Sequence, residues 1–150
     1  RNYWQKEDDM KRELILNTRY GEFKLGASID EYKQMPHHMD IYEEESFSYE
    51  CYVFEQEGVE LWCEKGIVNT IFPWKECLYE GKDLLKMSFD DFVTMVGESP
   101  NDEDTVYVPQ NNGKGQNQHV YDFDNLGLQL WVWRNRIRTA LIYKGDDADK

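Results

Sequence analysis

Two short stretches of the chain alternate apolar and polar residues in the same order. Residues 59–64 read VELWCE and residues 128–133 read LQLWVW. Alternate residues of a β-strand point to opposite sides of the sheet. The pattern therefore predicts two strands, each with an aliphatic side that faces a core and a second side that carries a tryptophan among polar residues.

The two strands belong to a longer repeat. Residues 52–70, YVFEQEGVELWCEKGIVNT, return sixty-nine positions later without a gap as residues 121–139, YDFDNLGLQLWVWRNRIRT. Turn residues follow each alternating strand, and a second apolar strand follows each turn. The chain thus encodes the same hairpin twice, with turns at Lys65-Gly66 and near Arg134-Asn135 and return strands at 67–72 and 137–143.

A predicted helix start precedes each hairpin. Ser28 is followed three residues later by Glu31, and Ser88 by Asp91. A serine hydroxyl can cap a free helix N–H, and acids in the first turn favour the positive end of the helix dipole. We therefore expect two short helices, ended by Pro36 in the first unit and by Gly97 with Pro100 in the second.

These elements predict an α+β fold in a single domain, residues 1–150. Two tandem helix-plus-antiparallel-sheet repeats, at about 20–72 and 81–143, would form one continuous sheet with the helices on one face. Further expectations are loops at 98–105 and 110–118, a helix in the leader 1–16 and a frayed tail at 145–150.

The charge narrows the choice of partners. The chain has 30 acidic and 17 basic residues, a net charge of −13, which repels phosphate backbones and anionic lipids. We expect no nucleic-acid partner, no membrane and instead a basic protein. No apolar run approaches the ~20 residues of a membrane span, and three cysteines without metal-ligand spacing fit a reducing cytoplasm.

The residues that usually carry catalysis are sparse. His37 and His38 are adjacent, so in a helix or a strand their rings diverge and chelate poorly. The three cysteines lack a neighbouring histidine and are interpreted as small buried hydrophobes. We therefore expect no catalytic residue, no metal and no cofactor.

The repeat resembles a known architecture. The motifs 25-LGASIDE-31 and 81-GKDLLKMSFDDF-92, with the two G-x-x-L-W hairpins, resemble the tandem repeats of the beta-lactamase inhibitor protein and of small outer-membrane assembly lipoproteins over residues 20–143. On an acidic chain the layout is similar to bacterial toxin immunity proteins of the contact-dependent growth inhibition type. Lys86, where a small residue is usual, and 36-PHH-38, in place of Gly-x-Pro, depart from the pattern.

The polar side of the repeated sheet is the candidate binding site. Tryptophan is enriched at interface centres, and acids orient a basic partner; the alternative is that Trp62 and Trp131 belong to the core. The predicted partner-binding residues are Glu60, Trp62, Glu64, Asp122, Asp124, Gln129, Trp131 and Trp133.

The expected function is that of a cytoplasmic immunity protein, a monomer or weak dimer, that occludes the active site of a basic protein toxin domain, for example a nuclease. One alternative is an extracytoplasmic enzyme inhibitor or envelope assembly factor of the same fold, which requires a cleaved signal. The other is a small enzyme that uses carboxylates or the His37/His38 pair.

Overall fold

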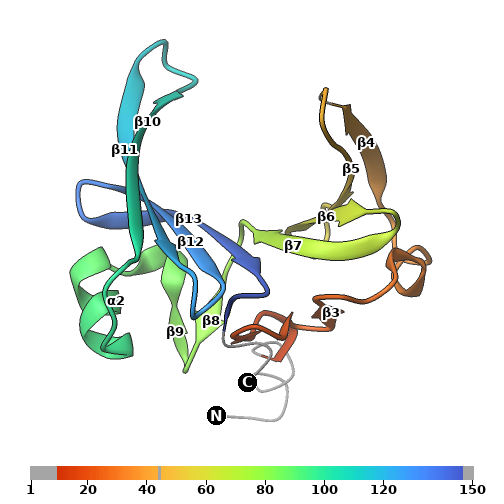
Figure 1. Ribbon diagram of the computed structural model, residues 1–150, viewed down its shortest axis with the longest axis horizontal. Helices are drawn as coiled ribbons and strands as arrows, with labels where there is room; N and C mark the ends of the chain where they lie inside the picture. The colour runs from red at the N-terminus through yellow and green to blue at the C-terminus, as the bar shows by residue number, and fades with distance from the viewer. Residues whose placement is uncertain (1–9, 44, 147–150) are drawn as a thin grey trace.

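The computed structural model of the protein describes residues 10–43 and 45–146 (Figure 1). Its centre is one antiparallel sheet in the order β10-β11-β12-β13-β7-β6-β5-β4. The strands are β4 (His38–Glu43), β5 (Ser48–Phe54), β6 (Val59–Glu64), β7 (Ile67–Pro73), β10 (Asp102–Pro109), β11 (Gly115–Phe123), β12 (Leu128–Trp133) and β13 (Arg136–Tyr143).

The sheet consists of two four-stranded meanders that meet at β7 and β13, where Ile71 lies opposite Ile142. The register is irregular after Trp62 in the first meander and after Trp131 in the second, positions that differ by the same sixty-nine residues as the sequence repeat. The two β-hairpin turns also match. Both turn residues have positive φ in each hairpin, as a type I′ turn requires: Lys65 and Gly66, then Arg134 and Asn135.

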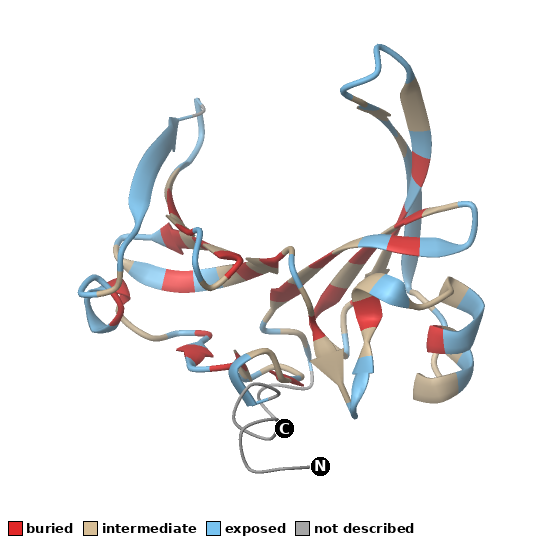
Figure 2. Ribbon diagram, turned by 180° about the vertical axis from the view of Figure 1, so that it is seen from behind, coloured by how far each residue is buried: buried red, intermediate tan, exposed pale blue. Residues whose placement is uncertain are grey.

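One face of the sheet is covered and the other is not (Figures 1 and 2). The covering layer packs against the aliphatic side of the strands, where Val59, Leu61, Leu128 and Leu130 are completely buried. The burial predicted for the aliphatic side is thus confirmed. The covering elements are β1 (Leu14–Ile15), β2 (Arg19–Tyr20), β3 (Phe23–Lys24), η1 (Ile29–Glu31), β8 (Leu78–Tyr79), β9 (Lys82–Asp83), η2 (Leu84–Lys86) and α2 (Phe89–Val96).

The predicted α+β class with two helix-plus-sheet repeats is wrong, because the described chain is mostly β. Of the two capped helices predicted before the hairpins, the second forms: α2 is capped by Ser88 and ends at the left-handed Gly97. In place of the first predicted helix the chain forms only the three-residue 3₁₀ helix η1, which is capped by Ser28. Its apolar residues explain this. They recur every third position at 29, 32 and 35, which fits three residues per turn, whereas 89, 92, 93 and 96 follow the α-helical spacing.

Two further expectations need correction. Residues 102–105 and 115–118, predicted to be loops, belong to β10 and β11, because the strand ladder stabilises polar segments that lie away from the core. Residues 1–9 of the predicted leader helix and 147–150 of the predicted frayed tail lie outside the described residues. In the remainder of the leader, Leu14–Ile15 form β1. Among the described helices, none has the length and apolarity to cross a membrane.

Candidate partner-binding face

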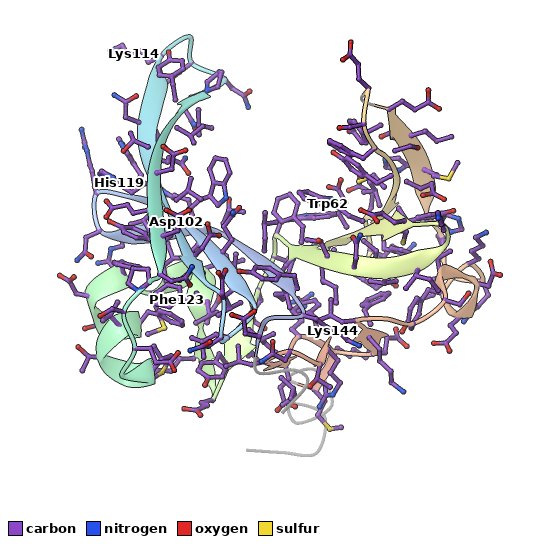
Figure 3. The ribbon with its side chains drawn as sticks, viewed as in Figure 1. Trp62, Asp102, Lys114, His119, Phe123 and Lys144 are labelled. Atoms are coloured by element: carbon purple, nitrogen blue, oxygen red, sulfur yellow. The ribbon has the colours of Figure 1, made fainter. Side chains whose placement is uncertain are left out.

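The uncovered face of the sheet, here called the concave face, curves between two raised arms, the β4–β5 and β10–β11 hairpins (Figure 1). Strand alternation places Trp62 here, opposite Cys51 and Thr70, and Figure 3 shows its side chain on this side of the sheet. Trp131 occupies the equivalent place opposite Val120 and Thr139. Both indoles are half-buried and lie outside the buried core cluster.

Each of these tryptophans is oriented by a residue of its own strand. The Trp62 Nε1–H donates to Glu60 Oε1 at 3.2 Å, and the Trp131 Nε1–H donates to Gln129 Oε1 at 2.9 Å. Gln129 in turn donates to Asp122 Oδ1 at 2.9 Å. A buried or half-buried indole needs such an acceptor, so the acids and amides near the tryptophans hold the rings in place.

A chain of aromatic contacts crosses the first meander. Tyr42 stacks on Tyr49 with ring centroids 5.2 Å apart, and Tyr49 lies 5.9 Å from Trp62. Beyond it, Trp62 and Phe72 are 6.5 Å apart, and Phe72 and Trp74 are 6.3 Å apart. These five residues, the aromatic ladder, connect the β4–β5 arm to the junction of the meanders.

Only part of the ladder could be recognised in the sequence. Trp62 and Trp131 lie on strands separated by β7 and β13, three strand spacings apart, or about 14 Å in the direction perpendicular to the strands. They are also offset along the strands, because Trp62 pairs with Thr70, which lies opposite Tyr143, whereas Trp131 pairs with Thr139. Phe72 on β7 and Trp74, one residue after the end of β7, continue the same alternation, which places them on the side of Trp62. Tyr42 and Tyr49 were not predictable, because their position depends on the pairing of β4 with β5.

Several of the predicted acids have structural partners. Glu60 accepts hydrogen bonds from Trp62 and from the Cys51 thiol. Asp124 lies beyond the end of β11, where it accepts from Asn101 Nδ2 at 2.8 Å and from the Tyr143 hydroxyl at 3.1 Å. Because it is engaged at this end of the sheet, Asp124 lies away from the tryptophans.

Exposed acids of the concave face come instead from the outer strands. Strand register places Asp40 opposite Cys51, Asp104 opposite Val120 and Asp102 opposite Asp122. All three side chains are exposed, and Figure 3 marks Asp102 on β10. Together with the exposed Glu64, they give both halves of the face negative charge that is available to a partner.

The cysteine thiols are poor candidates for nucleophiles. Cys51, Cys63 and Cys77 are free and buried. Burial, followed by the hydrogen bond to Glu60, raises the pKa of the Cys51 thiol far above its usual range, and burial raises the pKa of Cys63 to about 12. A nucleophilic cysteine needs the opposite shift, because the thiolate is the reactive form.

Ionisation of the buried thiols is expected to lower the free energy of unfolding at alkaline pH. The pKa of Cys63 is raised from 9.0 to about 12 on folding, so its contribution is fully present below pH 9 and decreases as the pH rises from 9 towards 12. At pH 10.5 the Cys63 thiol is ionised in the unfolded chain but not in the folded protein. This single difference should lower the free energy of unfolding by about 2 kcal/mol. Urea unfolding at pH 8 and 10.5 measures the effect, and an unchanged midpoint would contradict it.

His37 and His119 lie in separate places and do not form a cluster with each other. The His37 ring contacts the carbonyl oxygen of Met35 through Nδ1 at 2.8 Å and packs near Phe54, while His119 Nδ1 lies 3.6 Å from Glu103 Oε1. Over residues 10–43 and 45–146, no group of three or more His, Cys, Asp or Glu could hold a metal ion.

Comparisons of the chain with protein-family models, with curated proteins and with solved structures found no match.

Proposed function

We propose that this protein is a cytoplasmic immunity protein, which neutralises a positively charged protein toxin by docking its concave face over the toxin's active site. The observation that carries the proposal is the aromatic ladder along an acidic sheet face, in which Tyr42 is exposed and the other four rings are half-buried. Neither the aromatic residues nor the acids are needed by the core, which lies on the other side of the sheet.

The aromatic ladder would contribute most of the binding free energy of such an interface. Tyrosine and tryptophan cover much area while losing little rotamer freedom, and they dominate the centres of protein interfaces. The contacts from Tyr42 to Trp74 and the hydrogen bonds of both indoles restrict these rings before binding. A pre-ordered surface loses less entropy when the partner docks.

The concave face is large enough for a stable complex. Eight strands about 4.8 Å apart span roughly 34 Å, and strands of six to nine residues span roughly 20–30 Å. The resulting area, roughly 700–1000 Å², is comparable to the ~800 Å² that each partner contributes to an interface of standard size.

The charge selects the partner. With a net charge of −13 and exposed acids on both outer strands, the protein attracts a basic surface and repels an acidic one. An enzyme that acts on nucleic acid has such a basic surface around its active site. A toxin nuclease therefore fits the proposal best.

Reversing three acids of the concave face should slow association with the toxin. We expect the variant Asp40→Lys, Asp102→Lys, Asp104→Lys to associate about tenfold or more slowly at low salt and to show a weaker salt dependence, since steering acts through long-range charge. The dissociation rate should change less. Surface plasmon resonance with the toxin encoded beside this protein measures both rates.

A matched variant separates local charge from net charge. Glu22, Glu31 and Glu80 are exposed on the covering side of the sheet, so their reversal to Lys changes the net charge equally and should affect association much less. The proposal itself requires that an equimolar amount of protein abolishes the activity of the purified toxin. Undiminished toxin activity at tenfold excess of the protein would contradict it.

A further inference from the structure

The hairpin between β12 and β13 carries a basic cluster on an otherwise acidic protein. The Arg134 guanidinium carbon lies 4.3 Å from the centre of the Trp133 ring, and that of Arg138 lies 5.1 Å from it. Arg136 is directly opposite Trp133 in the strand register. All three arginines are exposed. We call these four residues the arginine cluster.

Within the described residues, no carboxylate forms an ion pair with the three arginines, although acids greatly outnumber bases. The acidic first turn of α2 contacts this hairpin, where the Asp90 backbone N–H donates a hydrogen bond to Asn135 Oδ1 at 3.2 Å. That turn belongs to the covering layer, whereas Trp133 faces the concave side.

The equivalent hairpin of the first meander shows that the fold does not need these arginines. Both hairpins have the same type of turn and the same register irregularity. Both also receive a backbone hydrogen bond from the residue after a capping serine, Ile29 N to Gly66 O at 2.8 Å and Phe89 N to Asn135 O at 2.9 Å. Trp133, Arg134, Arg136 and Arg138 correspond to Glu64, Lys65, Ile67 and Asn69.

We propose that the arginine cluster is a second docking site, which binds a carboxylate-bearing segment of the partner protein and so determines which way round the partner sits. A guanidinium stacked on an indole keeps its edge N–H groups free, and these match a carboxylate with two hydrogen bonds. The stacking also holds the guanidinium groups in position before binding.

The orientation follows from the symmetry of the sheet. The two meanders present similar backbones to a partner, so backbone shape alone discriminates poorly between two docking orientations related by rotation. The aromatic ladder lies in one meander, and the arginine cluster lies at the outer corner of the other. A partner with a basic centre and an acidic segment to one side fits in one orientation only. This inference rests on the proposed function.

A nucleic acid is a less suitable occupant than a protein carboxylate. The exposed acids Asp102 and Asp104 lie on the same half of the concave face as the cluster. A long phosphate backbone would have to pass these acids, whereas a short acidic segment of a protein would contact the three arginines alone.

The test compares three variants in toxin binding by isothermal titration calorimetry. Replacement of Arg134, Arg136 and Arg138 by Glu should raise the Kd at least a hundredfold, and replacement by Lys about tenfold, because lysine keeps the charge but loses the planar fork. The control reverses Lys24, Lys82 and Lys86 to Glu on the covering side, with the same change in net charge, and should alter the Kd less than threefold.

A second measurement is independent of the toxin. A peptide of ten glutamates, added at low salt to the isotope-labelled protein, should shift the Trp133 indole resonance in the wild type and not in the triple Glu variant. A short DNA duplex should leave this resonance unchanged. Equal shifts in both proteins, no shift in either, or a stronger shift with DNA would overturn the inference.

The outcomes separate the two proposals. If Trp62→Ala weakens toxin binding and the triple Glu variant binds as the wild type does, the arginine cluster has no docking role and the proposed function stands. If the wild type does not bind the toxin, the proposed function fails, and the peptide measurement still decides whether the cluster binds carboxylates.

Discussion

Replacing Trp62 and Trp131 together by alanine is expected to raise the Kd for the toxin about a thousandfold or more. Each indole is a half-buried aromatic side chain on the concave face, and loss of such an anchor costs about 2 kcal/mol or more. The two sites lie on either side of the junction between the meanders, far enough apart for their effects to add. A sum of about 4 kcal/mol corresponds to a thousandfold change in Kd.

The effect should appear mainly in the dissociation rate, because desolvated anchors act after the encounter. Tyr107→Ala provides the control. This exposed aromatic residue lies on β10 opposite Asn117, and its side chain is on the other side of the strand from Val106 and Asp104, away from the concave face. It should leave the Kd unchanged. If the double variant retains its circular dichroism spectrum and binds within threefold of the wild type, the concave face is not the site.

Gly127→Ala is expected to destabilise the fold by about 2–5 kcal/mol. Gly127 has a φ of 64°, and a Cβ added there would lie 2.1 Å from the backbone oxygen of Tyr143. The left-handed conformation costs an alanine about 1–2 kcal/mol, and displacement of packed backbone adds about 1–3 kcal/mol. Urea unfolding followed by tryptophan fluorescence measures the loss.

The sequence repeat supplies a matched control for this prediction. Gly58 corresponds to Gly127 and has a similar φ of 69°, but an added Cβ would meet side-chain carbons of Lys75, Cγ and Cδ at 2.6 Å and Cβ at 3.0 Å, and not backbone. Both glycines accept an equivalent hydrogen bond, from Trp74 N and Tyr143 N, at 2.9 Å. Gly58→Ala should therefore cost less than Gly127→Ala, because the Lys75 side chain moves more easily than the Tyr143 backbone; the left-handed conformation itself costs about 1–2 kcal/mol at either position. Equal losses in both variants would show that the close approach to Tyr143 is not the cause.

The parts of the fold that the sequence predicts are those that a core requires. The strands β6 and β12 must bury every second residue, and this constraint leaves a visible alternation in Val59–Glu64 and Leu128–Trp133. The edge strand β4 lacks such a signal, because all six of its residues are exposed. It exists through its pairing with β5, a contact that local sequence does not encode.

The helices show the limit of capping signals. Ser28 and Ser88 both cap the first turn of a helix, as predicted from their spacing to a following acid. The cap marks where a helix begins and does not determine its length. The length depends on the apolar spacing that follows, which is three residues after Ser28 and α-helical after Ser88.

The residues of the candidate site also differ in whether a single strand of sequence is enough to predict them. Trp62 and Trp131 were predictable from alternation within single strands, whereas Tyr42 and Tyr49 depend on the register of neighbouring strands. The acids near the tryptophans were predicted to contact the partner. Glu60 and Asp122 accept hydrogen bonds from Trp62 and Gln129 within the face, as half-buried polar groups generally do, and their contact with a partner stays a prediction.

The two outermost strands have a consequence for how the protein behaves at high concentration. β4 and β10 end the sheet, and their outer backbone N–H and C=O groups are a template for pairing with another molecule. Both strands carry acids, Asp40 and Glu43 on one and Asp102, Glu103 and Asp104 on the other. Mutual repulsion between these carboxylates opposes edge-to-edge polymerisation at neutral pH. High salt screens the charges of exposed groups, so concentrated protein at high ionic strength loses this barrier and edge-to-edge association is favoured.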